Sequence, residues 1–188
     1  MASFTIGGVK PKNININGTK CKKVTVNGIT IWTSNITIKN LVGSAAVDCI
    51  HYADGGLGSQ YHTLISVGAT KGHRYYLRWS LMRYGEFQYI TNDMLLSPDN
   101  GTYLHRLGDG GNTYEVPGHT IVTASENSIG FVHGGSIQTY AGYSAYTKAK
   151  AYMIVDLTEL EAAKGKTYTA DSFYSEIGQF YGSKEISI

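Results

Sequence analysis

The stretch His73-Arg74-Tyr75-Tyr76-Leu77-Arg78-Trp79-Ser80-Leu81-Met82 predicts a β-strand with two different faces. Its odd-numbered positions carry His, Tyr, Leu, Trp and Leu. Its even-numbered positions carry Arg74, Tyr76, Arg78, Ser80 and Met82. Because successive side chains of a strand point to opposite faces of the sheet, the odd face is core-like and the even face is amphipathic. Such a strand covers a core with one face and is suited to contacts on the other.

Further strand signals recur about every ten residues along the chain, separated by clusters of Gly, Asp and Asn. We expect strands near 45–51, 61–67, 73–82, 87–90, 103–107, 120–124, 128–133, 137–140 and 148–157. Many short strands at even spacing, with almost no helical periodicity, predict an all-β chain that folds as a two-sheet antiparallel sandwich.

The N-terminus carries a near-repeat of alternating apolar and polar residues in 4–8, 14–18 and 24–28. Asn17-Gly18 and Asn27-Gly28 are strong hairpin signals, because both central residues of a type I′ turn need positive φ. We therefore expect residues 1–34 to form a small β-hairpin or β-meander element for attachment and residues 35–188 to form the sandwich with a C-terminal helical tail. Three short strands bury little, so the meander must lean on the body or on another copy.

Helical signals appear only near the C-terminus. Thr158 followed by Glu161 is typical of a capping box, and Gly165 can end that helical turn. Thr169 is expected to cap a second helix, which packs on the sandwich as a closing lid. The apolar stripe of that helix consists of Phe173, Ile177, Phe180 and Tyr181.

The composition limits the classes of partner. The formal net charge of +2 over 188 residues, without a Lys/Arg cluster, argues against nucleic acid or an anionic membrane surface. No apolar run is long enough to insert into a bilayer, and residues 1–10 lack a signal peptide's charged and apolar regions, so we expect synthesis in a cytoplasm. Cys21 and Cys49 are expected to be free thiols.

No catalytic constellation is recognisable. The chain has no phosphate loop and no Gly-x-Ser-x-Gly elbow, and its six histidines lack metal-type spacing. Residues brought together from distant strands are the remaining catalytic alternative. We therefore expect a protein that is not an enzyme and has no cofactor. Asp99 and Asp109 are candidate ligands of a structural Ca²⁺ ion, although Asx residues also serve as ordinary turn residues.

The 15 tyrosines are the most informative polar-aromatic feature. A face with tyrosine rings and arginine forks suits sugars, whose C–H faces stack on aromatics while their hydroxyls bond to charged donors. The alternative is that these tyrosines pack between sheets or in a subunit interface. The candidate glycan-contacting residues are Arg74, Tyr76, Arg78, Tyr140, Tyr143 and Tyr146.

Two stretches resemble known sequences. Residues 16–32, INGTKCKKVTVNGITIW, resemble a short hairpin element of bacteriophage and prophage tail proteins. GHRYY at 72–76, YMIVDLT at 152–158 and Thr169 followed by Phe173 are similar to the carbohydrate-binding-module-like jelly rolls of tail-fibre and baseplate proteins. The chain departs from that pattern at 162–169, AAKGKTYT, where the family carries a G-x-G-N-E-P-T turn.

This resemblance implies a jelly-roll sandwich, a place in a virion tail or tail-like particle among other tail proteins, and often a homotrimer. The first functional hypothesis is therefore a receptor-binding protein that recognises a bacterial surface polysaccharide. The second is a structural tail component whose aromatic faces form protomer interfaces, and the third is a polysaccharide hydrolase.

Overall fold

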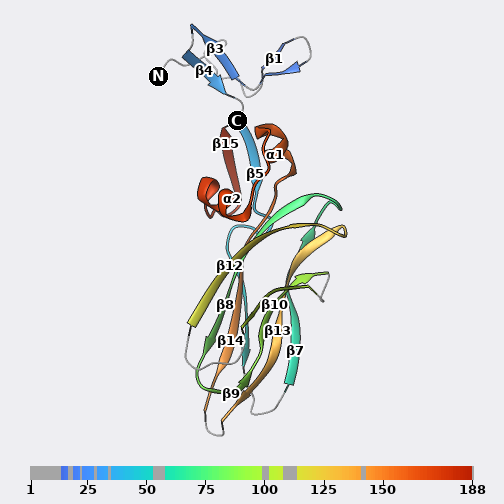
Figure 1. Ribbon diagram of the computed structural model, residues 1–188, viewed down its shortest axis with the longest axis vertical. Helices are drawn as coiled ribbons and strands as arrows, with labels where there is room; N and C mark the ends of the chain where they lie inside the picture. The colour runs from blue at the N-terminus through green and yellow to red at the C-terminus, as the bar shows by residue number, and fades with distance from the viewer. Residues whose placement is uncertain are drawn as a thin grey trace.

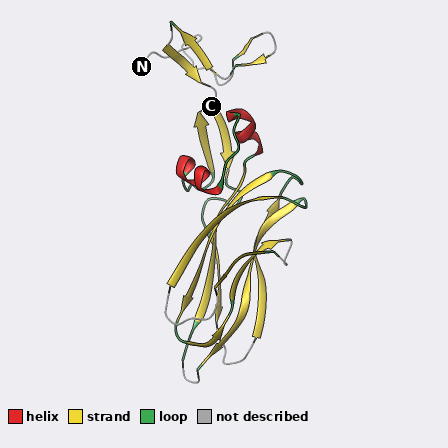
Figure 2. Ribbon diagram, viewed as in Figure 1, coloured by secondary structure: helices red, strands yellow, loops and turns green. Residues whose placement is uncertain are grey.

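The computed structural model describes residues 14–16, 19–21, 23–27, 29–33, 35–52, 58–98, 102–107, 114–140 and 143–187. Figure 1 shows these residues as an elongated β-rich molecule, with two small hairpins at one end and two long-stranded sheets at the other. A small unit of strands and helices lies between them (Figure 2). The prediction of an antiparallel β-sandwich with a short C-terminal helical part is confirmed.

The body consists of two antiparallel sheets. In the four-stranded sheet the order is β12 (Tyr114–Thr123), β8 (Arg74–Tyr84), β14 (Tyr146–Asp156) and β6 (Val47–Tyr52). In the five-stranded sheet the order is β11 (Tyr103–Leu107), β10 (Asn92–Ser97), β13 (Ser128–Thr139) and β7 (Gly58–Gly68). The fifth strand, β9 (Phe87–Ile90), also pairs with β13.

The main core fills the space between these sheets. The odd-numbered side chains of β8 point into it, as the alternation predicts, with Leu77 and Leu81 fully buried and Trp79 6.0 Å from Phe131 of β13 between ring centroids. Burying one such large apolar side chain stabilises the fold by about 1.5–3 kcal/mol. The even-numbered face of β8 therefore forms the outer surface of the four-stranded sheet.

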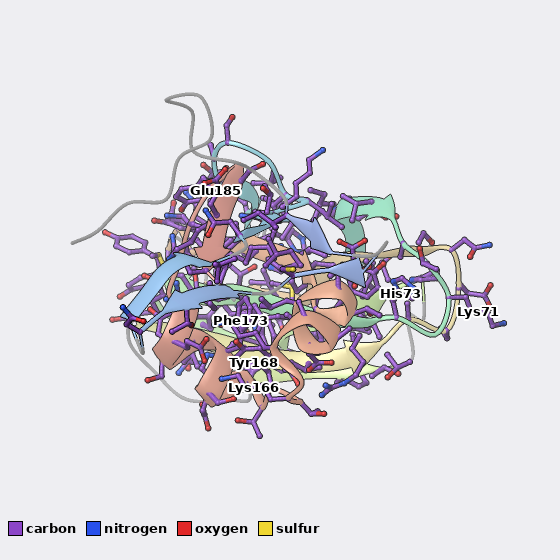
Figure 3. All side chains as sticks on the ribbon, turned by 90° about the horizontal axis from the view of Figure 1, so that it is seen from above. Lys71, His73, Lys166, Tyr168, Phe173 and Glu185 are labelled. Carbon is purple, nitrogen blue, oxygen red and sulfur yellow. The ribbon has the colours of Figure 1, made fainter. Side chains whose placement is uncertain are left out.

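A second core forms on part of that outer surface. β5 (Asn35–Lys39) pairs with β15 (Ser183–Ser187), and α1 (Thr158–Lys164) and α2 (Ala170–Ile177) lie beside this strand pair (Figure 1). Seen from above, Phe173 and Tyr168 lie side by side (Figure 3), with ring centroids 5.6 Å apart. The buried residues of this second core are Ile38, Tyr76, Met153, Val155, Leu157, Leu160, Tyr168, Phe173, Ile177 and Ile186.

The two helices begin differently from one another. Thr169 caps α2 as expected, because its hydroxyl accepts a hydrogen bond from Ser172 N while Ser172 Oγ accepts one from Thr169 N. Thr158 does not cap α1; Leu157 holds the N-cap position, and Asp156 Oδ1 accepts from Thr158 N at 2.9 Å. The expected stripe is only half helical, since α2 ends at Ile177, before Phe180 and Tyr181.

Asn40 joins the C-terminal unit to the sandwich. Its fully buried side chain donates to the carbonyls of Tyr152 and Phe180 and accepts from the amides of Val42 and Ile154, at 2.8–3.1 Å. These four bonds use the whole capacity of the amide group. They hold β14 where its register shifts between Ala151 and Met153.

At the N-terminal end, β1 (Asn15–Ile16) pairs with β2 (Thr19–Lys20), and β3 (Lys23–Val26) pairs with β4 (Ile29–Thr33). The Val26–Ile29 pair and the positive φ of Asn27 (49°) confirm the second predicted hairpin. Within the described part of 14–33, the strands form two hairpins. Residues 1–13 lie outside the described residues, and the division at residue 34 stays a prediction.

Among the described residues, no helix is both long and apolar enough to cross a membrane.

Candidate functional site

The C-terminal unit covers the first half of the predicted contact face. Tyr76 is 0% exposed, and its ring centroid lies 4.4 Å from that of Phe173 in α2. Burial raises the pKa of its hydroxyl, which has no hydrogen-bond partner among the described residues. Tyr76 therefore cannot reach a ligand in this structure, and the expectation that it lies on an open face was wrong.

The two arginines of that face contact the same unit. Arg74 pairs with Glu161 of α1 and donates to the carbonyl of Tyr168 at 3.1 Å. Arg78 donates to Gln179, and its guanidinium carbon lies 4.5 Å from the centroid of the Tyr174 ring. The sequence correctly indicates an amphipathic face, but the C-terminal helices pack on half of that face and cover it.

The uncovered end of the same sheet carries a row of three tyrosines. Tyr146 of β14 lies directly opposite Tyr52 of β6 and Tyr84 of β8 in the strand register. The Tyr84 and Tyr146 rings are stacked, with centroids 5.1 Å apart and planes 18° apart, and the Tyr52 centroid lies 5.8 Å from that of Tyr146. Tyr52 is 67% exposed and Tyr84 51%. We call these three residues the tyrosine row.

The neighbours of the three tyrosines along each strand show that the tyrosine row faces away from the core. Thr147, Arg83 and His51 are buried between the sheets, so the adjacent row residues point outward. One step along β14, Lys148 Nζ lies 2.7 Å from Asp48 Oδ2. The hydrogen bond to this lysine is the largest cause of the lowered pKa of the Asp48 carboxyl. The row is thus an aromatic strip beside a charged pair on a solvent-facing sheet surface.

Two more exposed tyrosines belong to the connection between β13 and β14. The ring centroids of Tyr140 and Tyr143 are 6.3 Å apart, at an interplanar angle of 71°. Tyr143 is three residues before Tyr146 in the chain, so this pair lies at the same end of the sandwich as the row. Of the six predicted site residues, Tyr140, Tyr143 and Tyr146 are therefore in this region. Sequence reasoning missed Tyr52 and Tyr84, which only strand register connects to Tyr146.

The outer surface of the five-stranded sheet has a small pocket of about 220 Å³ that sequence reasoning also missed. Tyr61 of β7 and Tyr103 of β11 form its walls, and Leu95 and Val132 form its floor. No local motif reveals this pocket, because the four described residues that line it come from four strands. We call it the Tyr61–Tyr103 pocket.

Several polar residues lie in the interior of the sandwich. His133 is fully buried, with its Nε2 3.0 Å from Asn92 Oδ1. Burial, with the nearby His51 and His62, lowers the pKa of His133 to about 4. No group of three or more metal-binding side chains occurs among the described residues. The candidate Ca²⁺ ligands Asp99 and Asp109 lie outside them.

No protein-family model matches the chain, and no curated protein matches it. Among solved structures, a chain of the infectious bursal disease virus Gt strain aligns at 12% identity and a TM-score of 0.36, covering 88% of this chain and 40% of that one. The VP2 subviral particle of the same virus aligns at 11% identity and a TM-score of 0.29, covering 77% and 37%.

A third match is the Podospora anserina GH26-CBM35 β-(1,4)-mannanase, at 13% identity and a TM-score of 0.23, covering 62% of this chain and 27% of that one. The chain thus spans well under half the length of each of these neighbours. At such TM-scores the likenesses carry no argument about ligands or partners, so the function has to be inferred from the residues of the chain itself.

Proposed function

We propose that this chain is a non-catalytic recognition protein of a phage or prophage tail, which binds a bacterial surface polysaccharide at the tyrosine row. The observation that carries the proposal is the alignment of Tyr52, Tyr146 and Tyr84 across three neighbouring strands, with two rings stacked. The assignment to a tail rests on the sequence resemblance at 16–32 and 72–76.

A row of rings on a flat sheet suits an extended polymer. Aromatic faces attract the C–H faces of sugar rings, and several rings in line can contact successive residues of one chain. The tyrosine hydroxyls and the Lys148–Asp48 pair lie beside the rings and supply directional bonds to sugar hydroxyls. The rings also lose little conformational freedom on binding, since each has only two side-chain torsions.

The proposed mechanism is binding without bond cleavage, and no cofactor takes part in it. Two carboxyls of a retaining glycosidase lie about 5–5.5 Å apart on either side of the scissile bond. Near the row, Asp48 is paired with Lys148, and Glu115 lies 3.4 Å from the hydroxyl of Tyr152. Because both carboxylates already have partners, these contacts favour a role in orienting neighbouring side chains over a catalytic role.

The test is binding of the full chain to a glycan array and to purified cell-wall and capsular polysaccharides. We expect the Tyr84→Ala, Tyr146→Ala double variant to lose binding about tenfold or more, because each stacked ring contributes on the order of 1 kcal/mol. Tyr181→Ala is the matched control, since it removes an exposed tyrosine of the C-terminal unit. Unchanged polymer binding in the double variant would show that the row is not the site.

A second function fits one further observation. Ile50, which is 40% exposed, lies two residues before Tyr52 on the same outward face of β6. An exposed isoleucine next to aromatic rings is also typical of a protomer interface in a structural tail component. Light scattering distinguishes the two: an interface predicts an oligomer that Ile50→Asp dissociates, whereas a glycan platform predicts an oligomeric state unaffected by this change.

A further inference from the structure

We infer that the Tyr61–Tyr103 pocket is a second binding site, on the opposite face of the sandwich from the tyrosine row, and that it holds one uncharged pyranose ring. This inference shares its ligand chemistry with the proposed function but none of its residues. The row suits the length of a polymer, and the pocket suits a single ring such as a chain end or a branch.

The strand register builds the walls and the floor of the pocket. Tyr103 lies opposite Leu95, and Leu95 lies opposite Val132, so edge strand β11 contributes a ring beside two central apolar side chains. Leu95 and Val132 are 3% and 4% exposed. Tyr61, from edge strand β7, closes the other side. Each tyrosine is 48% exposed, which leaves a ring surface open to a ligand.

Gly134 gives Tyr61 its position. This residue lies between Asp93 and Tyr61 in the register, on the same outward face. Because glycine has no side chain, the Tyr61 ring can extend over the strand to Asp93, to which its hydroxyl donates at 3.4 Å. Asp93 is fully buried, so it does not itself contact a ligand in the pocket.

This arrangement sets the polarity of the Tyr61 hydroxyl. Burial raises its pKa, and Asp93 and Tyr103 raise it further, so the phenol keeps its proton at neutral pH. The Tyr61 hydroxyl is hydrogen-bonded to both Asp93 and Tyr103, and its remaining lone pair can accept a bond from a sugar hydroxyl. Tyr61 is thus both a stacking ring and an oriented acceptor.

The volume and lining of the pocket select the ligand class. About 220 Å³ is below the roughly 300–1,000 Å³ of drug-sized sites, so one ring fits and an oligosaccharide does not. Among the described residues, the four that line the pocket carry no charge, which favours a neutral ring over an ionised one. Two aromatic walls with a hydroxyl acceptor match the apolar C–H faces and polar rim of a pyranose better than a purely aliphatic group.

The test is a titration of the full chain, followed through backbone amide NMR shifts, with single-ring probes. The probes are the methyl glycosides of glucose, galactose, mannose, rhamnose and N-acetylglucosamine, each to about 50 mM, since one small ring binds in the millimolar range. We expect saturable shifts at the amides of Tyr61, Leu95, Tyr103 and Val132 with at least one glycoside. No saturable shift there with any of them would overturn the inference.

Variants separate the ring of Tyr61 from its hydroxyl. Tyr103→Ala is expected to abolish the shifts, and Tyr61→Phe to weaken the glycoside about fivefold, the value of one neutral hydrogen bond. Unchanged affinity in both variants would contradict the assignment. N-acetyl-leucine amide is the peptide-like probe; if it binds at these residues more tightly than every glycoside, the pocket takes an apolar side chain instead of a sugar.

The outcome is independent of the proposed function. Tyr84→Ala in the tyrosine row is the matched control, and it should leave the pocket shifts intact. If the row variants lose polymer binding while no glycoside enters the pocket, only the present inference fails. If glycosides enter the pocket while the row variants bind polymer normally, the proposed glycan site at the tyrosine row is wrong and the inference about the pocket is upheld.

Discussion

At the scale of single residues, Gly135 is one of the most constrained positions in the sandwich. Its φ is 145°, and a Cβ there would overlap the backbone carbonyl of Thr91. We expect Gly135→Ala to lower the free energy of unfolding by about 3 kcal/mol or more, because the obstacle is backbone and cannot rotate away. Urea unfolding measures this change.

Gly165 is the matched control for Gly135. Its φ is also positive, at 64°, but a Cβ there would meet nothing within 4 Å. Gly165→Ala should therefore cost only about 1 kcal/mol, the strain of the left-handed region itself. Equal losses in the two variants would mean that close approach to Thr91 is unimportant.

His133 predicts how stability depends on pH. Its pKa is about 4 in the folded state, against about 6.5 for an exposed histidine, because burial penalises the imidazolium and His51 and His62 add to this. Between these two values the unfolded chain binds one more proton than the folded chain. The free energy of unfolding therefore rises with pH between about 4 and 6.5. His133 contributes about 3 kcal/mol to this rise, and its contribution is constant above pH 6.5.

Unfolding free energies across this window test that contribution. His133→Gln removes the titrating group while offering Asn92 a donor, so its profile should be flatter than that of the parent chain between pH 4.5 and 6.5. The lowered pKa of Glu176, caused first by its bonds to Lys164 and Lys166, acts below about 4.5 and does not interfere. Parallel profiles for the two chains would contradict the assignment to His133.

At the scale of elements, the most deeply buried contact of α2 with the sheet is made by Phe173, beside outer contacts of Asp171 and Tyr174 with His119. Phe173 is fully buried between Tyr76 and Tyr168, with ring centroids 4.4 and 5.6 Å away. Phe173→Ala should lower the free energy of unfolding by about 3–5 kcal/mol, the range for a buried phenylalanine. Exposure of Tyr76 in the variant would appear as a change in tyrosine fluorescence.

The adjacent residue Tyr174 provides the comparison for Phe173. It lies on the exposed side of α2, where Arg78 covers its ring. Tyr174→Ala should cost no more than about 1 kcal/mol, the value of a solvent-exposed cation–π contact. If the two alanine variants were equally destabilised, the buried aromatic contact would not be what holds α2.

Alternation of side chains predicted most strands, because it reflects which face of a sheet is buried. It missed β10, since Asn92 and Asp93 are turn-type residues; in the structure both are buried, with Asn92 bonded to His133 and Asp93 to Tyr61. It also divided β13 in two at Gly134-Gly135. That pair lies inside the strand. Gly135 packs closely against the backbone of Thr91, and Gly134 leaves room for the ring of Tyr61.

The candidate site was predictable only in part, for a related reason. The even face of β8 is amphipathic over its whole length, and nothing local shows that α2 covers Tyr76 while Tyr84 stays open. Tyr146 was identified from its local tyrosine cluster, but its partners Tyr52 and Tyr84 come from strands far away in the chain. Register across a sheet is a tertiary property, and periodicity within one strand does not contain it.

At the scale of the whole molecule, the sandwich is expected to fold without the N-terminal hairpins. Among the described strands, β1 pairs with β2 and β3 with β4, while β5 is the first to pair within the C-terminal unit. A chain of residues 35–188 should therefore keep the free energy of unfolding of the full chain to within about 0.5 kcal/mol.

A chain of residues 41–188 is the comparison. It lacks β5, the buried Ile38 and the four hydrogen bonds of Asn40, so its free energy of unfolding should be several kcal/mol lower. A large loss already at 35–188 would mean that the hairpins stabilise the body, and that the division at residue 34 is wrong.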